Sequence, residues 1–152
     1  MVEKRFTDKV IVITGASRGI GLACAKRFEM EGAKVCTIQR SKSKLFDSYE
    51  FNLKHEQECL ESISTIYKKY GYIDVLVNNA GMMEEALIQD TSIDSWNNTL
   101  SLNLTAPFLM SKFAMPHLIR SKGCIVNIGS IEGIGANPKH AAYCASKAGL
   151  HG

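Results

Sequence analysis

Short runs of β-branched residues alternate with longer amphipathic segments along this chain, and this alternation limits its possible folds more than any other feature. Strands are expected at Val10–Thr14, Lys34–Gln39, Tyr49–Leu53, Ile73–Asn78 and Cys124–Gly129. Helices are expected at Gly19–Glu31, at His55–Lys69, from about Asp90 to Ile119, and from near His140. Strands that are apolar on both faces and separated by helices are typical of a parallel sheet covered on both sides. The pattern therefore predicts an α/β fold, a doubly wound parallel sheet formed by one domain over residues 1–152.

Composition excludes several functional classes. Lys and Arg number 18 and Asp and Glu 15, so the net charge is only +3, and the basic residues are scattered. This is too weak for a nucleic-acid footprint. No apolar run is long enough to span a membrane, and the first residues lack the apolar stretch of a secretory signal. The five cysteines form no CxxC pair, no His stands at metal-ligand spacing, and we expect a cytoplasmic protein without a bound metal.

A glycine-rich loop lies between the first predicted strand and the first predicted helix. It runs Thr14-Gly15-Ala16-Ser17-Arg18-Gly19-Ile20-Gly21. Glycines let the backbone turn tightly and approach a diphosphate, while the helix N-terminus offers free N–H groups and partial positive charge. A strand before the loop and an amphipathic helix after it make this a dinucleotide-binding pattern, rather than a plain strand-to-helix turn.

The second predicted strand ends in Gln39-Arg40, where dinucleotide-binding folds that prefer NAD carry an acidic residue for the ribose 2′-hydroxyl. A guanidinium is well shaped to bind a phosphate, so Arg18 and Arg40 together predict recognition of a 2′-phosphate. The sequence therefore favours NADP(H) over NAD(H). The alternative is that both arginines are simply solvated surface residues.

Three residues near the C-terminal end of the chain form a candidate catalytic group. Ser130 follows the last predicted strand, and Tyr143 and Lys147 are four residues apart, on one face of the last predicted helix. A phenol can protonate the alkoxide that hydride transfer to a carbonyl produces. A lysine cation about 4 Å away favours the phenolate by up to about 4 kcal/mol at an effective dielectric constant of about 20. The Ser130 hydroxyl would polarise the carbonyl oxygen.

Asn103 and Pro107 are the last candidate pair. Proline has no N–H, so it cannot donate the helical hydrogen bond to the carbonyl of Asn103, four residues earlier. That carbonyl would then be free to hold a water that relays protons toward Lys147. The alternative is that Asn103 is a surface amide and that Pro107 only kinks the helix.

These motifs resemble the short-chain dehydrogenase/reductase family, in particular its 3-oxoacyl-acyl-carrier-protein reductase and carbonyl reductase branch. The resemblance covers the whole chain: Thr14–Gly21, Asn78-Asn79-Ala80-Gly81, Asn103, Gly129-Ser130-Ile131, and Tyr143-x-x-x-Lys147 stand in family order. It implies a Rossmann-type fold and a tetrad of Asn103, Ser130, Tyr143 and Lys147, with Tyr143 as general acid/base.

The resemblance also implies how the cofactor is held. Lys147 would bind the nicotinamide ribose, and Asn79, Ala80 and Gly81 would border the cofactor and support the sheet. Asn52, followed by Leu53, stands where the family usually has an aspartate that contacts adenine, so adenine recognition is expected to be weaker. Family members act on small carbonyl or alcohol substrates and pair subunits through their long helices, which implies a homo-oligomer.

Family members also continue beyond the equivalent of Gly152, with further strands and a substrate loop. We therefore expect a sheet that lacks the family's last strands, and an apolar edge left uncovered at Cys124–Gly129. Two functions remain open at this point. One is an NADP(H)-dependent oxidoreductase that interconverts a ketone and a secondary alcohol; the other is a truncated, non-catalytic nucleotide-binding fragment or a partner-dependent binding module.

Overall fold

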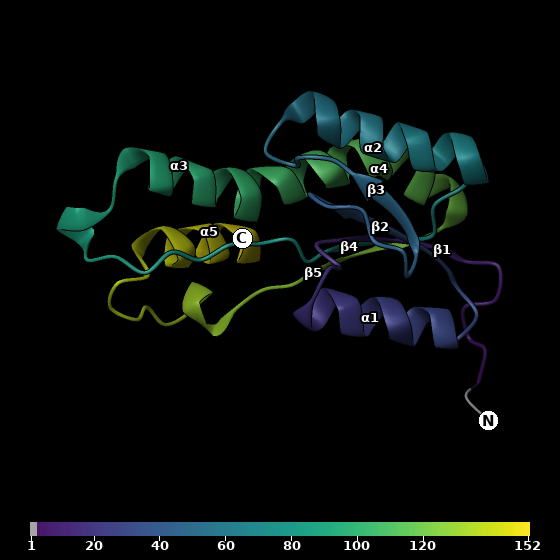
Figure 1. Ribbon diagram of the computed structural model, residues 1–152, viewed down its shortest axis with the longest axis horizontal. Coiled ribbons are helices and arrows are strands. Elements are labelled where there is room, and N and C mark those ends of the chain that lie inside the picture. The colour runs from purple at the N-terminus through teal and green to yellow at the C-terminus, as the bar shows by residue number, and fades with distance from the viewer. Residues whose placement is uncertain (1–2) are drawn as a thin grey trace.

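The computed structural model describes residues 3–152 as a parallel sheet with helices on both faces (Figure 1). The five strands are β1 (Val10–Thr14), β2 (Lys34–Gln39), β3 (Asp47–Glu50), β4 (Val75–Asn78) and β5 (Cys124–Asn127). Their order in the sheet is β3-β2-β1-β4-β5, and every neighbouring pair is parallel. The order reverses between β1 and β4, which makes the sheet doubly wound and places a crevice at the carboxyl ends of these two strands.

The helices divide between the two faces of the sheet, and each face has its own core. They are α1 (Gly19–Met30), α2 (Glu56–Tyr70), α3 (Ile93–Leu100), α4 (Ala106–Ser121) and α5 (Ala141–His151). On one face, α2 and α4 pack on the strands through residues such as Ile63, Ile66 and Met110. On the other face, α1 packs against the alternate strand residues, including Ile11 and Ile13. Every β1 residue is buried and all but Thr14 are apolar, as expected for a strand that is covered on both faces.

The observed elements follow the prediction closely, with two informative differences. The third strand is Asp47–Glu50 rather than Tyr49–Leu53. Its pairing with β2 begins at Asp47, opposite Cys36, and ends at Glu50, opposite Gln39. The long helical segment predicted from about Asp90 to Ile119 is not one helix. It consists of a short 3-10 turn at Ile88–Asp90, α3, a π-helical turn at Ser101–Thr105, and α4.

Strand β5 lies at the edge of the sheet and is poorly covered, as the sequence predicts. Within residues 3–152 it pairs with β4 alone, and the side chain of Val126 is 42% exposed. Val126 is level with Val77 of β4, so it faces the same side as the α1 core. Between residues 3 and 152, the structure has no helix that is both long enough and apolar enough to cross a membrane.

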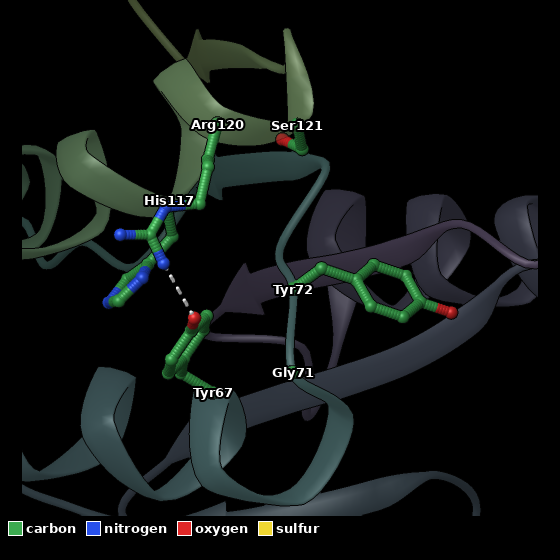
Figure 2. A pocket seen from close by; sticks show the side chains of 6 residues that line it. All are labelled: Tyr67, Gly71, Tyr72, His117, Arg120 and Ser121. Atoms are coloured by element: carbon green, nitrogen blue, oxygen red, sulfur yellow. Dashed lines mark hydrogen bonds between the residues drawn. The ribbon is translucent and has the colours of Figure 1, made fainter.

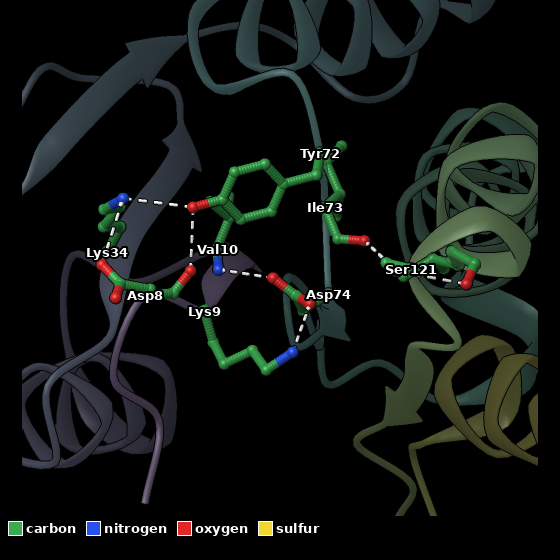
Figure 3. A network of polar contacts seen from close by, with 9 residues as sticks. Asp8, Lys9, Val10, Lys34, Tyr72, Ile73, Asp74 and Ser121 are labelled. Atoms are coloured by element: carbon green, nitrogen blue, oxygen red, sulfur yellow. Dashed lines mark hydrogen bonds and ion pairs between the residues drawn. The ribbon is translucent and has the colours of Figure 1, made fainter. Parts of the chain in front are cut away.

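A polar network closes the amino end of the sheet (Figure 3). The Asp74 carboxylate accepts a hydrogen bond from the buried Val10 N–H at 2.9 Å and pairs with the Lys9 ammonium at 3.0 Å. Ser121, at the end of α4, donates its hydroxyl to the Ile73 carbonyl at 2.6 Å. The network thus ties the start of β1, the segment before β4 and the end of α4 to one another.

A small pocket of about 130 Å³ lies at the same end of the molecule, between α2 and α4 (Figure 2). The His117 ring stacks on Tyr67 with 3.8 Å between ring centroids, and Arg120 donates a hydrogen bond to the Tyr67 hydroxyl at 3.1 Å. Burial lowers the pKa of His117, and the nearby Arg120 charge adds to this effect. These contacts join α2 to α4 at the end opposite the predicted site residues.

Candidate active site

The glycine loop fits against the chain that leaves β4. Gly15 has a φ of +69°, and a Cβ atom on it would lie 2.8 Å from the Cα of Ala80. A Cβ atom on Gly21 would lie 2.4 Å from the Asn79 side-chain nitrogen and 2.5 Å from the Gly15 carbonyl oxygen. All three distances are shorter than a real Cβ atom allows, so Gly15 and Gly21 are required for this close approach.

Thr14 and Asn79 hold this loop in place. The Thr14 hydroxyl accepts hydrogen bonds from the backbone N–H groups of Asn79 and Ala80, each at 3.0 Å. The Asn79 amide donates in return to the carbonyls of Thr14 and Gly15, at 3.0 and 2.9 Å. In the structure, Asn79 therefore braces the glycine loop, and Ala80 supplies the surface against which it packs.

The first turn of α1 faces outward from this braced loop. Arg18 is the N-cap residue, with an extended backbone and no side-chain capping hydrogen bond, and the first turn contains no acidic residue. Ser17, Arg18, Gly19 and Ile20 are all exposed. A helix N-terminus that is uncapped and free of acidic neighbours favours an anion.

A hollow of about 320 Å³ lies at the carboxyl ends of β2 and β3, lined by Arg40, Glu50, Phe51, Asn52 and Glu58. Arg40 and Asn52, two of the predicted cofactor residues, therefore do meet in one site. Leu53 is different, since its side chain is only 4% exposed and packs in the core of the α2/α4 face. Leu53 is not among the residues that line the hollow.

Asn103 is fully buried in the π-helical turn, and its side chain is completely engaged. Its Oδ1 accepts from the Met82 N–H and its Nδ2 donates to the Met82 carbonyl, both at 2.8 Å. Nδ2 also donates to the Ser146 hydroxyl at 3.1 Å, which links the turn to α5. The alternative of a surface amide is therefore wrong.

The π-helical turn changes the hydrogen-bond register just before Pro107. The Ala106 N–H donates to the Ser101 carbonyl, five residues back, instead of the usual four. Hydrogen bonding changes from the π-helical to the α-helical pattern at this point. Pro107 has no N–H to donate in either pattern, so the change sacrifices no donor at its position. A water on the Asn103 carbonyl stays a prediction.

The α5 helix carries Tyr143 and Lys147, one turn apart. The Lys147 side chain is buried, and its ammonium donates to the Ile128 carbonyl at 2.6 Å, immediately after β5. The ammonium lies 5.7 Å from the centroid of the Tyr143 ring. Burial lowers the pKa of Lys147 because the charged form loses solvation. The Ser146 hydroxyl donates to the Tyr143 carbonyl at 2.7 Å, so Asn103 contacts this helix directly beside the tyrosine.

Ser130 begins a 3-10 turn, Ile131–Gly133, that packs against α5. Its hydroxyl oxygen accepts from the Glu132 N–H at 3.2 Å. A Cβ atom on Gly133 would lie 2.8 Å from the carbonyl carbon of Lys147, so the turn touches the helix backbone. Ser130, Tyr143 and Lys147 therefore lie on two segments in direct contact.

Glu132 is a half-buried carboxylate in this region that the sequence did not reveal. It accepts hydrogen bonds from the Asn137 side-chain amide, from the Asn137 N–H at 3.1 Å and from the Cys144 thiol at 3.2 Å. These donors, with Asn137 first, lower the pKa of Glu132 to about 2. Glu132 thus fastens the loop that starts at Ser130 to α5, next to Tyr143. No spacing rule in the sequence connects these positions.

Comparison with known proteins agrees with this geometry. The family model described as short chain dehydrogenase matches residues 9–152, nearly the whole chain. The chain belongs to the short-chain dehydrogenase family. Its relatives in this family include the meso-2,3-butanediol dehydrogenase of Serratia marcescens, at 36% identity over 94% of this chain and 61% of the relative. They also include a 3-oxoacyl-acyl-carrier-protein reductase of Thermotoga maritima, at 36% identity over 97% of this chain and 66% of the relative.

Among solved structures, the ligand-free aldohexose dehydrogenase of Thermoplasma acidophilum superimposes with a TM-score of 0.93 at 37% identity. The match covers 98% of this short-chain dehydrogenase chain and 60% of the aldohexose dehydrogenase. The chain thus spans about two thirds or less of the length of these relatives. The Rossmann-type fold and the oxidoreductase family are established by these matches.

Proposed function

We propose that this chain carries the cofactor site and the proton-transfer site of an NADP(H)-dependent oxidoreductase. The reaction is the interconversion of a ketone, or a 3-oxoacyl group, and a secondary alcohol. The observation that carries the proposal is α5 itself: it holds Tyr143 beside the buried ammonium of Lys147 and is tied through Ser146 to Asn103. Membership of an oxidoreductase family supports the reaction class.

The residues at the carboxyl end of the sheet fit a nicotinamide dinucleotide. A side chain at Gly21 would fill the loop cradle, and the first turn of α1 is uncapped and exposed. Arg18 and Arg40, both exposed, would bind the 2′-phosphate that distinguishes NADP(H) from NAD(H). When bound, the reduced nicotinamide supplies the hydride.

The chain's own residues would handle the proton. Tyr143 gives its phenolic proton to the developing alkoxide, and the Lys147 cation favours the resulting phenolate by its charge. The Ser130 hydroxyl hydrogen-bonds the same oxygen and polarises the carbonyl. Lys147 also binds the nicotinamide ribose, and the Asn103 carbonyl holds the water that returns a proton to Lys147.

The decisive test is a fluorescence titration of the purified chain with NADPH and NADH. Trp96 serves as the energy-transfer donor to the reduced nicotinamide, and the intact mass is checked on the same sample. We expect NADPH to bind more tightly than NADH, and Arg40→Ala to weaken NADPH alone by about tenfold, the effect of losing one charge-assisted contact. Equal binding of both cofactors by the native chain would contradict the NADP(H) preference.

A second candidate function is nucleotide binding without turnover, alone or with a partner. The specific observation that favours it is the exposed face of β5, where the side chain of Val126 is 42% exposed and could meet a partner. A panel of ketones with NADPH separates the two. Turnover that is lost in Tyr143→Phe supports the oxidoreductase, whereas NADPH binding without turnover supports the binding module.

We also propose that the protein acts on small molecules as a homo-oligomer in the cytoplasm. Phe108, Met115 and Ile119 of α4 are 63%, 42% and 70% exposed, and such side chains favour burial against another subunit. The location rests on the sequence argument alone. Sedimentation velocity over a range of concentrations tests the assembly, and a monomer at every concentration would contradict it.

A further inference from the structure

We propose that Glu58 is the residue that recognises the adenine base, through a hydrogen bond from the base's 6-amino group to its carboxylate. The inference rests on the proposed function, in that a nicotinamide dinucleotide with an adenine end is the ligand. It assigns to a helix residue the role that the sequence reasoning gave to Asn52.

The hollow that Glu58 lines lies where the adenosine end of a dinucleotide would reach. The Gly15 N–H donates to the Ile38 carbonyl of β2 at 2.8 Å, and the Phe51 N–H donates to the Gln39 carbonyl at 3.1 Å. These bonds place the glycine loop, the end of β2 and the end of β3 side by side. A dinucleotide with its diphosphate on the glycine loop therefore extends over Arg40 into the hollow of about 320 Å³.

Asn52 is largely occupied by its own surroundings. Its Oδ1 accepts from the Lys54 N–H at 3.3 Å, its N–H donates to Glu58 Oε2 at 2.5 Å, and its carbonyl accepts from the His55 N–H at 3.1 Å. The side-chain amide hydrogens are the main groups that Asn52 has left for a ligand. They are donors, and the 6-amino group of adenine is also a donor.

Glu58 supplies the acceptor that this arrangement needs. It is half-buried on α2, and the bond from the Asn52 N–H fixes one carboxylate oxygen at the wall of the hollow. Within residues 3–152, no hydrogen bond or ion pair engages its Oε1. An ionised carboxylate accepts hydrogen bonds only, so it favours an amino group over a carbonyl oxygen at that position of the base. Arg40 lines the same hollow, and its planar guanidinium can stack on the purine ring.

The test compares adenine with hypoxanthine, in which an oxygen replaces the 6-amino group. NADPH and its deamino analogue carry the same phosphates, so their affinity ratio cancels any repulsion between Glu58 and the 2′-phosphate. We expect the native chain to bind NADPH about tenfold more tightly than the analogue, the effect of one charge-assisted hydrogen bond. In Glu58→Gln the ratio should fall to about one, because an amide can donate to the hypoxanthine oxygen as well as accept.

Glu58→Gln can still accept from the Asn52 N–H, so its fold should be kept. The matched control is Glu61→Gln, an exposed residue on the same helix outside the hollow, which should keep the native ratio. An amino-to-deamino ratio near one in the native chain, or an unchanged ratio in Glu58→Gln, would overturn the inference.

A parallel titration with 5′-AMP and 5′-IMP separates this inference from the proposed function. If AMP binds better than IMP in a Glu58-dependent way while NADPH does not bind, the proposed function fails and the adenine role stands. If NADPH binds without any preference for the amino group, the adenine role fails and the proposed function stands. If none of these nucleotides binds, both are overturned.

Discussion

The two ends of the sheet use their polar groups in opposite ways. At the amino end, charged groups are bonded within the protein: Asp74 binds the Val10 N–H and the Lys9 ammonium, and the buried Glu31 carboxylate pairs with Arg5 and Arg27. At the carboxyl end, the first turn of α1 is uncapped, and Arg18 and Arg40 are exposed. We call the amino end and the carboxyl end of the sheet its two rims. In this topology the polar groups of one rim stabilise the fold, while hydrogen-bond donors at the other rim are left for a ligand. Mutations at the two rims should therefore have separable effects.

The largest effect is expected at the glycine loop. Gly21→Ala places a methyl group 2.4 Å from the Asn79 amide and 2.5 Å from the Gly15 carbonyl, so the loop must shift. We expect NADPH affinity to fall by roughly a hundredfold, from an overpacking cost of up to about 3 kcal/mol. Fluorescence titration measures it, with Gly135→Ala as the control because that position is open. Native affinity in Gly21→Ala would show that the cradle does not hold the cofactor.

The amino end should respond in stability rather than in binding. Asp74→Ala leaves the buried Val10 N–H without a partner, which should lower the free energy of unfolding by about 2 kcal/mol. Urea unfolding of the native and variant chains measures this change. The matched control is Asp8→Asn, which removes an exposed charge 3.6 Å from Lys34, keeps a residue type that tolerates the φ of +62° at this position, and should have little effect. A clear loss of NADPH affinity in folded Asp74→Ala would break the separation between the two rims.

Acid should lower the stability of the contacts at both rims, through Glu31 at the amino end and Glu132 at the carboxyl end. Hydrogen bonds from Arg5 and then Arg27 lower the pKa of Glu31 to about 2, and the pKa of Glu132 is lowered to a similar value by Asn137 and Cys144. A depressed pKa contributes stability above the unfolded value of 4.5, and this stability is lost as pH falls from 4.5 toward 2.

Glu31→Gln and Glu132→Gln should each be less stable than the native chain at neutral pH and less sensitive to acid. Urea unfolding at several pH values between about 6 and 3 measures this slope. A variant that retains the native slope would show that its carboxylate does not contribute to acid sensitivity.

The smallest effect is expected at an exposed ion pair between α2 and α4. The Lys112 ammonium lies 3.1 Å from the Glu56 carboxylate, with both side chains at least half exposed. Lys112→Ala should change the free energy of unfolding by less than about 0.5 kcal/mol, because water screens the pair. Urea unfolding of Lys112→Ala and Asp74→Ala under the same conditions compares their losses of unfolding free energy directly. A loss of the same size in both variants would mean that burial is not what makes the amino-end network strong.

The sequence predicts most of the fold because the central strands β1 and β4 are almost entirely apolar and the glycine loop stands between a strand and a helix. It also brings out Ser130, Tyr143 and Lys147, which the structure places on two segments in contact. The break in the long helix was harder to predict, since Pro107 signals a kink but not a π-helical turn. Glu58 and Glu132 could not be identified, because Asn52 and Asn137, which donate hydrogen bonds to them, lie in loops whose paths depend on the folded packing.

The bonds of Asn103 have a consequence for the chemical ageing of the protein. Its side-chain amide bonds both the N–H and the C=O of Met82, as a neighbouring strand would, and so acts as an extra peptide unit beyond the end of β4. Deamidation replaces this amide with a carboxylate of nearly the same shape that cannot donate. The change would break the bonds to the Met82 carbonyl and to Ser146 together, so the loop after β4 and the α5 helix would lose their common anchor without any change in side-chain volume.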